Sequence, residues 1–270
     1  MPSLDVGTSV VSERPFSQGA SEPLVVAHRG ASAREAENTL AAFEAAVAAG
    51  ADAVEFDVRL TADRVPVVIH DADLSRTTDR SGLVASMPLD EVRAARIPTG
   101  RGVETVPTFR EVLDALSGRI SIDVELKHLP GEPDVDAGGA HLVAATLDVL
   151  ADAAFEGDVL VSSFDPFALD RVVSRDPSLA TGLLTTRDVD ALAGVTFARD
   201  RGYRWVLPFI GAATAAGDAL TTTAHAAGIR VGTWLTDRPS EAVALFRAGL
   251  DAVATNDPEP IVAAVREAFA

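Results

Sequence analysis

The stretch AVEFDVRLTADRVPVVIH, residues 53–70, contains two β-rich runs separated by a short polar turn. In the first run the alternation of side chains puts Glu55 and Asp57 on one face of a strand. Only residues 61–64 separate this run from residues 65–70, and four residues are too few for a crossover helix. The stretch therefore predicts an antiparallel β-hairpin.

Pairing across this hairpin brings His70 next to the two acidic side chains. A turn centred on residues 62–63 pairs positions whose numbers sum to about 125, within an uncertainty of about two residues. Glu55 then lies opposite His70, and Asp57 lies opposite Val68. The predicted register puts an imidazole beside two carboxylates.

The rest of the chain alternates β-rich runs with segments of helical spacing, such as Ala140–Ala153 and Ala213–Ala227. Besides the hairpin, we predict strands at Leu24–His28, Ala53–Arg59, Ile120–Leu126, Val159–Ser163, Ala180–Leu184, Tyr203–Pro208, Arg230–Leu235 and Asp251–Thr255. Eight strand–helix units predict an α/β fold, a (β/α)8 TIM barrel with an extra β-hairpin and an insertion after the second strand. A doubly wound open sheet is the main alternative.

The chain divides into a short leading segment and one domain. Residues 1–22 are rich in Ser, Pro and Gly and lack periodicity, so we predict a flexible N-terminal tail. Residues 23–270 then form a single TIM-barrel domain of ordinary size. Residues 71–106 are polar and too long for a usual loop. We expect this insertion to lie over the active site, because long loops of such barrels gather at the catalytic face.

Composition limits the partners. The chain has 270 residues, no cysteine and a formal net charge of −17. Such an acidic protein repels nucleic acid, and an anionic substrate would need a local cation. No apolar run reaches the ~18 residues of a membrane span, and residues 1–22 do not resemble a signal peptide. We therefore expect no nucleic-acid partner, no membrane span and a cytoplasmic protein, and leave the oligomeric state open.

Candidate chemistry lies where the predicted strands end. His28 and Arg29 follow the first strand and offer a proton carrier and a planar donor for an anion. Glu55 and Asp57 face into the barrel, where two carboxylates repel unless a cation intervenes. A solvated pair on an exposed edge is the alternative, but parallel barrel strands have no exposed edge.

The third strand adds further charged side chains. Asp123, Glu125 and Lys127 share one face by alternation. A third carboxylate completes a set of oxygen ligands suited to Mg²⁺ or Ca²⁺, and Lys127 can neutralise it or hold a phosphate oxygen. With the histidines, this set suits cleavage of a phosphoester.

Other polar or aromatic residues are weaker candidates for the pocket. Glu37 and Asn38 precede a helix, where Asn38 also suits the role of N-cap. Ser163 and Trp234 end later strands, and Trp234 is equally suited to the core.

Together these stretches resemble the glycerophosphodiester phosphodiesterase family. Their order and spacing span almost the whole chain after residue 22. The matching segments are His28-Arg29-Gly30, Glu37-Asn38-Thr39-Leu40, Glu55-Phe56-Asp57-Val58, VPVVIHDADLSRTTD at 65–79, VELK at 124–127 and Ser163-Phe164.

The resemblance implies metal-dependent hydrolysis of a small glycerophosphodiester to sn-glycerol 3-phosphate and an alcohol. Attack through a cyclic phosphate and direct attack by water both stay open. The implied site residues are the acid–base pair His28 and His70, the ligands of one divalent cation Glu55, Asp57 and Glu125, and the phosphate contacts Arg29 and Lys127.

Four places in the chain depart from the family pattern. Ala36 stands where a Pro is usual, and Arg64 where the hairpin turn usually has a Gly. Trp234 is followed by Leu235-Thr236-Asp237 where a Thr-Val-Asn-like run is usual, and Asn256 stands where an Asp is usual. The last two departures lie near the expected pocket, and we expect them to bear on the preferred head group but not on the metal or the histidines.

Three other functions fit parts of the pattern. Cleavage of lysophospholipid or sphingolipid head groups would require an exposed apolar rim. A metal-dependent lyase or aldolase barrel would not need histidines at both His28 and His70. A catalytically silent binding protein would fit better if one of the histidines or carboxylates were missing.

Overall fold

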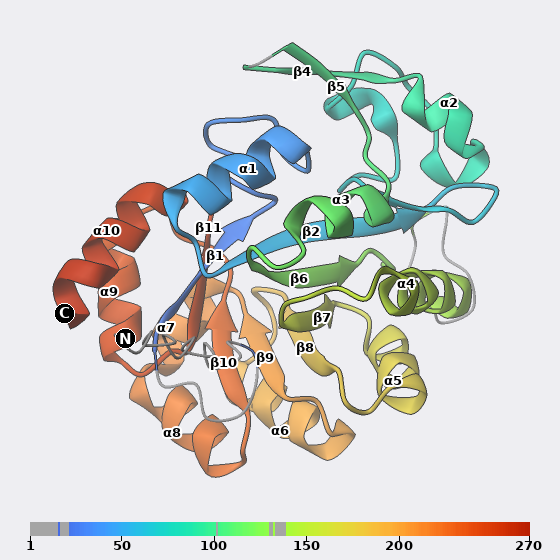
Figure 1. Ribbon diagram of the computed structural model, residues 1–270. Helices are drawn as coiled ribbons and strands as arrows, with labels where there is room; N and C mark the ends of the chain where they lie inside the picture. The colour runs from blue at the N-terminus through green and yellow to red at the C-terminus, as the bar shows by residue number, and fades with distance from the viewer. Residues whose placement is uncertain (1–15, 17–21, 101, 130–131, 133–138) are drawn as a thin grey trace, which may run out of the picture.

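The computed structural model describes residue 16 and residues 22–100, 102–129, 132 and 139–270. Its centre is a closed barrel of eight parallel strands, in which β1 pairs with both β11 and β2 (Figure 1). The predicted barrel is confirmed, and each strand lies within two residues of its predicted bounds. The barrel strands are β1 (Leu24–His28), β2 (Ala53–Leu60), β6 (Ser121–Leu126), β7 (Val159–Ser163), β8 (Ala180–Thr185), β9 (Trp205–Pro208), β10 (Arg230–Thr233) and β11 (Ala252–Thr255).

Helices cover the outside of the barrel (Figure 1). One helix over 213–227 was predicted, but two form, because Gly217, at φ 54° and ψ −145°, interrupts the helical backbone. Among the described residues, no helix combines the length and apolar character needed to cross a membrane. The helices that follow barrel strands are α1 (Leu40–Ala49), α3 (Phe109–Leu116), α4 (Ala140–Ala153), α5 (Pro166–Arg175), α6 (Ala191–Arg201), α7 (Ile210–Ala216), α8 (Asp218–Ala226), α9 (Pro239–Arg247) and α10 (Pro258–Phe269).

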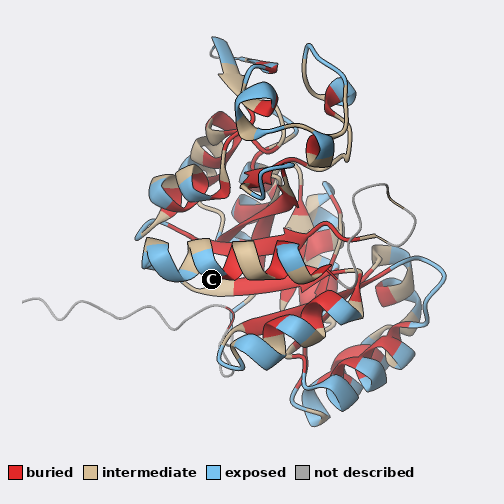
Figure 2. Ribbon diagram, turned by 90° about the vertical axis from the view of Figure 1, so that its right-hand side faces the viewer, coloured by how far each residue is buried: buried red, intermediate tan, exposed pale blue. Residues whose placement is uncertain are grey.

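The strands turn apolar side chains toward the helices. On β2, the buried ring of Phe56 lies between Phe43 of α1 and Phe109 of α3, with centroids 5.6 and 5.9 Å away. Figure 2 shows buried residues in the barrel and on the inner faces of its helices. Because side chains alternate along a strand, Glu55 and Asp57 face the barrel interior.

β2 continues beyond its pairing with β1 and forms the predicted hairpin with β3 (Pro66–Val68). Val58, rather than Asp57, lies opposite Val68, so the register differs from the predicted one by a single residue. The Ile69 amide donates to the Asp57 carbonyl at 3.0 Å. This pairing holds the end of the hairpin against the acidic strand.

The insertion at 71–106 carries short elements of its own beside the end of β2 (Figure 1). Its buried apolar side chains form a separate cluster with Val67 and Ile69 of the hairpin. Whether it covers the active site stays a prediction. Its elements are the 3-10 turns η1 (Leu74–Arg76) and η2 (Val84–Ser86), the helix α2 (Leu89–Arg93), and the paired strands β4 (Arg96–Thr99) and β5 (Gly102–Thr105).

Most of the predicted N-terminal tail lies outside the described residues, which include Phe16 and Glu22 of it. Phe16 is 1% exposed, and its ring packs edge-on against Trp205 at 5.8 Å between centroids. This contact places Phe16 at the end of the barrel where the strands begin.

Candidate active site

Three acidic side chains meet inside the barrel on β2 and β6. The strands pair in register, with Asp57 beside Glu125 and Glu55 beside Asp123. Glu55, Asp57 and Glu125 are buried, and each offers a carboxylate oxygen within 4.8 Å of the others. The predicted ligand set is thus brought together at one place.

Burial and mutual repulsion shift the titration of these acids. Burial, reinforced by the charges of Asp57 and Glu125, raises the pKa of Glu55 well above its ordinary value. Burial also raises the pKa of Glu125, although Lys127 opposes it. Burial acts the same way on Asp57, but Lys127 and Arg29 outweigh it and hold the Asp57 pKa below its usual range. When all three carboxylates are ionised, they carry more negative charge than Lys127 and Arg29 neutralise, and the raised pKa values reflect this repulsion.

Two carboxylate oxygens of this cluster are buried and lack a hydrogen-bond donor, which marks the place where a cation would be stabilised. Glu55 Oε1 and Asp57 Oδ1 are buried without a hydrogen-bond partner, which is costly for a carboxylate. Lys127 Nζ lies 3.3 Å from Asp57 Oδ1 and 2.7 Å from Glu125 Oε1. A hard divalent cation, which prefers oxygen ligands, fits this set of donors.

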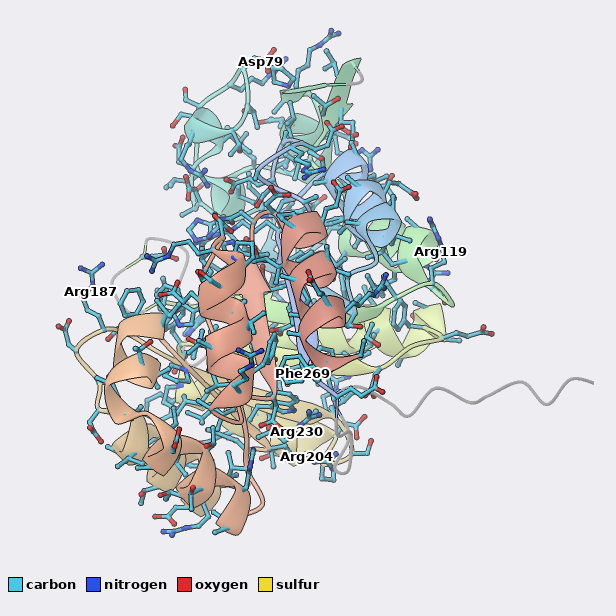
Figure 3. The ribbon with its side chains drawn as sticks, turned by 90° about the vertical axis from the view of Figure 1, so that its left-hand side faces the viewer. Asp79, Arg119, Arg187, Arg204, Arg230 and Phe269 are labelled. Atoms are coloured by element: carbon cyan, nitrogen blue, oxygen red, sulfur yellow. The ribbon has the colours of Figure 1, made fainter. Side chains whose placement is uncertain are left out.

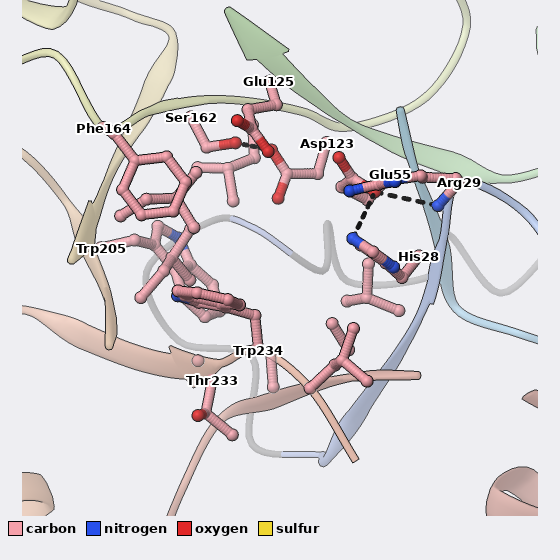
Figure 4. A pocket seen from close by; sticks show the side chains of 18 of the residues that line it. His28, Arg29, Glu55, Asp123, Glu125, Ser162, Phe164, Trp205, Thr233 and Trp234 are labelled. Carbon is pink, nitrogen blue, oxygen red and sulfur yellow. Dashed lines mark hydrogen bonds and ion pairs between the residues drawn. The ribbon is translucent and has the colours of Figure 1, made fainter. Parts of the chain in front are cut away.

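His28 is held so that one ring nitrogen faces the acids. Its Nδ1 lies 2.8 Å from Asn256 Oδ1, and its Nε2 lies 3.9 Å from Glu55 Oε2 (Figure 4). The Asn256 amide is oriented by Asp237, because Nδ2 donates to Asp237 Oδ2 at 2.9 Å. Its oxygen can therefore only accept, and His28 carries its proton on Nδ1. Burial, with the charge of Arg29, lowers the pKa of His28 and favours the neutral ring.

Asp237 and Asn256 are two of the positions that depart from the family pattern. They contact each other directly, since the backbone N–H of Asn256 also donates to Asp237 Oδ1 at 2.7 Å. These two residues thus form one pair that contacts His28, whereas the departures were expected to bear on the head group and not on the histidines. No local pattern in the sequence connects them, because the two positions lie 19 residues apart.

His70 lies at the cavity from the hairpin side and has a similar arrangement. Its Nδ1 is 2.6 Å from Asp71 Oδ1, which leaves Nε2 available to a ligand. Burial lowers the pKa of His70, although Asp57 and Asp71 oppose the shift. His28 and His70 therefore line the cavity as two imidazoles with anchored Nδ1 atoms.

Arg29 and Asn38 reach the acids from strained backbone positions. Both adopt positive φ angles, 57° and 59°, which non-glycine residues take up mainly at functional sites. Arg29 Nε lies 3.2 Å from Asp57 Oδ2, and Asn38 Nδ2 donates to the same oxygen at 2.7 Å. Glu37 in turn binds Arg29 and Arg76. Glu37 and Asn38 thus support Arg29 and Asp57 and are absent from the cavity lining.

The expected contact of substrate with Ser163 is not supported by its placement. Ser163 is fully buried, and its hydroxyl donates to the Leu126 carbonyl at 2.9 Å. Ser162 lines the cavity instead and donates to Asp123 Oδ1 at 2.7 Å. The alternation of β7 decides this, because adjacent residues point to opposite sides. Burial raises the pKa of Asp123 to about 7.

Aromatic side chains form the wall opposite the acids. Trp234 lines the cavity, as predicted, with its ring 5.6 Å from Phe164 and 5.2 Å from Phe209 between centroids (Figure 4). Arg187, on the loop after β8, stacks on Phe209 and projects outward (Figure 3). The cavity, which extends from the acids and this wall to Phe16 and Trp205, has a volume of about 360 Å³.

Comparison with known proteins agrees with this geometry. A profile of the glycerophosphoryl diester phosphodiesterase family matches residues 28–260. The chain belongs to this family. A glycerophosphodiester phosphodiesterase of Caldanaerobacter subterraneus is 30% identical over 258 residues, which cover 90% of this chain and 98% of that protein. As a member, the protein is an enzyme that hydrolyses phosphoric diesters.

Solved structures show the same likeness. An Oleispira antarctica phosphodiesterase in complex with the product sn-glycerol-3-phosphate superposes with a TM-score of 0.79 at 29% identity, covering 91% of this chain and 97% of that one. A Thermotoga maritima glycerophosphodiester phosphodiesterase gives 0.71 at 25% identity, covering 90% and 98%. The lyase and aldolase alternatives are excluded by this membership.

Proposed function

We propose that the cavity cleaves glycerophosphodiesters to sn-glycerol 3-phosphate and an alcohol with the help of one divalent cation. The observation that carries this proposal is the buried cluster of Glu55, Asp57 and Glu125 between the two imidazoles. The product named for the Oleispira antarctica relative supports the same substrate class.

The three carboxylates would hold Mg²⁺ or Ca²⁺, both of which take oxygen ligands. When bound, the cation supplies positive charge that neutralises the carboxylates and polarises a phosphoryl oxygen. Arg29 and Lys127 line the same cavity and would bind the remaining phosphate oxygens. The acidic surface makes such local cations necessary for an anionic substrate.

His28 and His70 divide the proton transfers. One imidazole, in its neutral form, removes the proton of the attacking hydroxyl, and the other, as the imidazolium, donates a proton to the leaving alcohol oxygen. Both use Nε2, since Asn256 and Asp71 engage the two Nδ1 atoms. Asp57, which Asn38 and Arg29 anchor, keeps its charge in this arrangement.

Release of sn-glycerol 3-phosphate from glycerophosphocholine tests the proposal. The protein is first dialysed against EDTA, and Mg²⁺ and Ca²⁺ are then restored separately. We expect activity to disappear with the chelator and to return with at least one cation. Full turnover after exhaustive chelation would refute the metal dependence, and no turnover of any glycerophosphodiester would refute the proposed substrate class.

A further inference from the structure

The cavity continues below the acidic cluster into the middle of the barrel. TIM-barrel interiors are usually filled by layers of bulky branched side chains. Here the interior positions Ala252 and Ala254 line the cavity with small side chains and leave space, whereas Leu207 occupies the space beside Gly232. Leu207 packs along the wall, because a Cβ on Gly182 would stand 3.0 Å, and one on Gly232 2.7 Å, from its methyl carbons.

Large aromatic side chains close the far end of this space. Phe16 and Trp205 both line the cavity and are nearly inaccessible to solvent. The Phe16 amide donates to Asp158 Oδ2 at 2.6 Å, and Trp205 Nε1 donates to the Phe16 carbonyl at 3.3 Å. Arg230 stacks on the outer side of this floor, 4.4 Å from the Trp205 ring. The floor is therefore fixed by hydrogen bonds as well as by packing.

Polarity separates along the depth of the cavity. The charged groups and the Asp123–Ser162 pair lie on the wall made by β1, β2, β6 and β7. We call the remaining, hydrocarbon-lined part the apolar shaft. It is lined by Val26, Leu160, Leu184, Leu207, Gly232, Ala252 and Ala254, with Phe16 and Trp205 as its floor.

A glycerol group would lose its hydrogen bonds to water in this shaft without replacing them, and a choline group would lose the hydration of its charge without meeting an anionic partner. Hydrocarbon, by contrast, gains from leaving water. The whole cavity, at about 360 Å³, is larger than the ~150 Å³ apolar cavity that stays dry and binds benzene. The apolar lining of the shaft therefore selects an apolar group attached to a phosphodiester head.

We propose that the apolar shaft binds an alkyl or acyl chain carried by the substrate, so that glycerophosphodiesters with one hydrocarbon chain are preferred over unsubstituted ones. This rests on the proposed function, because the phosphate must sit at the acidic cluster for its chain to enter below. The floor of Phe16 and Trp205 sets a length beyond which further methylenes no longer fit.

The test is a series of monoacyl glycerophosphocholines of increasing chain length, assayed below their micelle concentrations beside glycerophosphocholine. We expect kcat/KM to rise by up to about fourfold per methylene, then to level off where the shaft is full. A profile that is flat or falls from the first methylene would overturn the proposal while leaving turnover of glycerophosphocholine, and hence the proposed function, intact.

Two variants move the limit in opposite directions. Ala252→Leu fills the shaft and shortens the preferred chain, whereas Phe16→Ala removes the floor and lengthens it. Ala226→Leu, on the exposed end of α8, is the matched control and keeps the wild-type profile. Identical profiles in folded Ala252→Leu, Phe16→Ala and wild-type proteins would refute the shaft.

Binding of n-alkyl phosphates, measured by calorimetry, tests the shaft without turnover. Affinity should increase with chain length to the same limit as kcat/KM. Affinity independent of chain length would overturn the proposal even if the hydrolytic assay failed for an unrelated reason. If the alkyl phosphates bind with the expected limit but no glycerophosphodiester is cleaved, the proposed function fails and the shaft stands as a hydrocarbon-binding site.

Discussion

The two sides of the barrel interior are built by the same strand geometry, but one has an excess of negative charge and the other has unfilled volume. On β2 and β6, the inward positions carry Glu55, Asp57 and Glu125, whose burial leaves negative charge without sufficient compensation. On β11, the small side chains of Ala252 and Ala254 leave volume unfilled. One side therefore lacks positive charge, and the other lacks hydrocarbon. A divalent cation with a phosphodiester that carries an alkyl or acyl chain would supply both.

The largest expected effect is the loss of kcat when a histidine on the charged side of the cavity is replaced. His28→Asn and His70→Asn should each lower kcat by about 10²–10⁴-fold, the usual contribution of a general acid or base. His225→Asn is the control, because His225 is exposed and pairs with Asp251 before β11. Steady-state kinetics on glycerophosphocholine measures the effect. Equal losses in all three variants would mean that the two cavity histidines have no special role.

The second prediction concerns the missing positive charge. Saturating Mg²⁺ or Ca²⁺, at about 100 times its dissociation constant, should raise the free energy of unfolding by about 3 kcal/mol. In Glu55→Gln this gain should shrink, while the metal-free variant becomes more stable than metal-free wild type because a repelled buried charge is gone. Thermal melts with EDTA and with each cation measure both effects. A Glu55→Gln protein that is destabilised in EDTA and still gains fully from metal would contradict the cluster.

The third prediction uses Asp123, whose pKa is raised to about 7 by burial. The unfolded chain ionises near the ordinary value of 3.8, so the free energy of unfolding falls as the pH rises from about 4 to 7, and then levels off. Between pH 5 and 8 this group should remove about 3 kcal/mol of stability. Asp123→Asn should lack that loss in urea melts performed with EDTA. Parallel pH profiles for the two proteins would show that Asp123 does not titrate in this range.

The smallest effect belongs to the apolar side. Gly232→Ala places a Cβ 2.7 Å from a Leu207 methyl carbon and 3.3 Å from the Ala252 Cβ. We expect the overpacking to reduce the free energy of unfolding by about 1 kcal/mol without changing the stabilisation by metal. Melts with and without cation separate the two quantities. A loss of metal-induced stabilisation in Gly232→Ala would show that the two sides are not independent.

Local pattern was sufficient for much of the site. Alternation in residues 53–60 placed Glu55 and Asp57 inward, and the short turn before residues 65–70 brought His70 close, although the register was one residue off. The same alternation placed Asp123 beside Glu125. The prediction that Ser163 contacts the substrate is not supported, because its side chain does not reach the cavity. Which side chains of β7 face the barrel interior depends on how that strand pairs with its neighbours.

Other features depend on contacts between distant segments and have no local pattern. The pairing of Asp237 with Asn256, and of Asn256 with His28, arises only when β10, β11 and β1 close the ring. The support of Arg29 by Glu37 and of Asp57 by Asn38 likewise follows from a loop folding back over the strand ends.

The sequence alone determined the barrel, the order of its strands and the acids and imidazoles at their ends, because hydrophobic periodicity and residue type act within a few neighbouring positions. Only the tertiary structure decided how much of the interior those strands leave empty. That volume depends on the combined size of side chains from all eight strands and from Phe16, and these residues are spread over almost the whole chain. It therefore cannot be estimated from any short segment of the sequence.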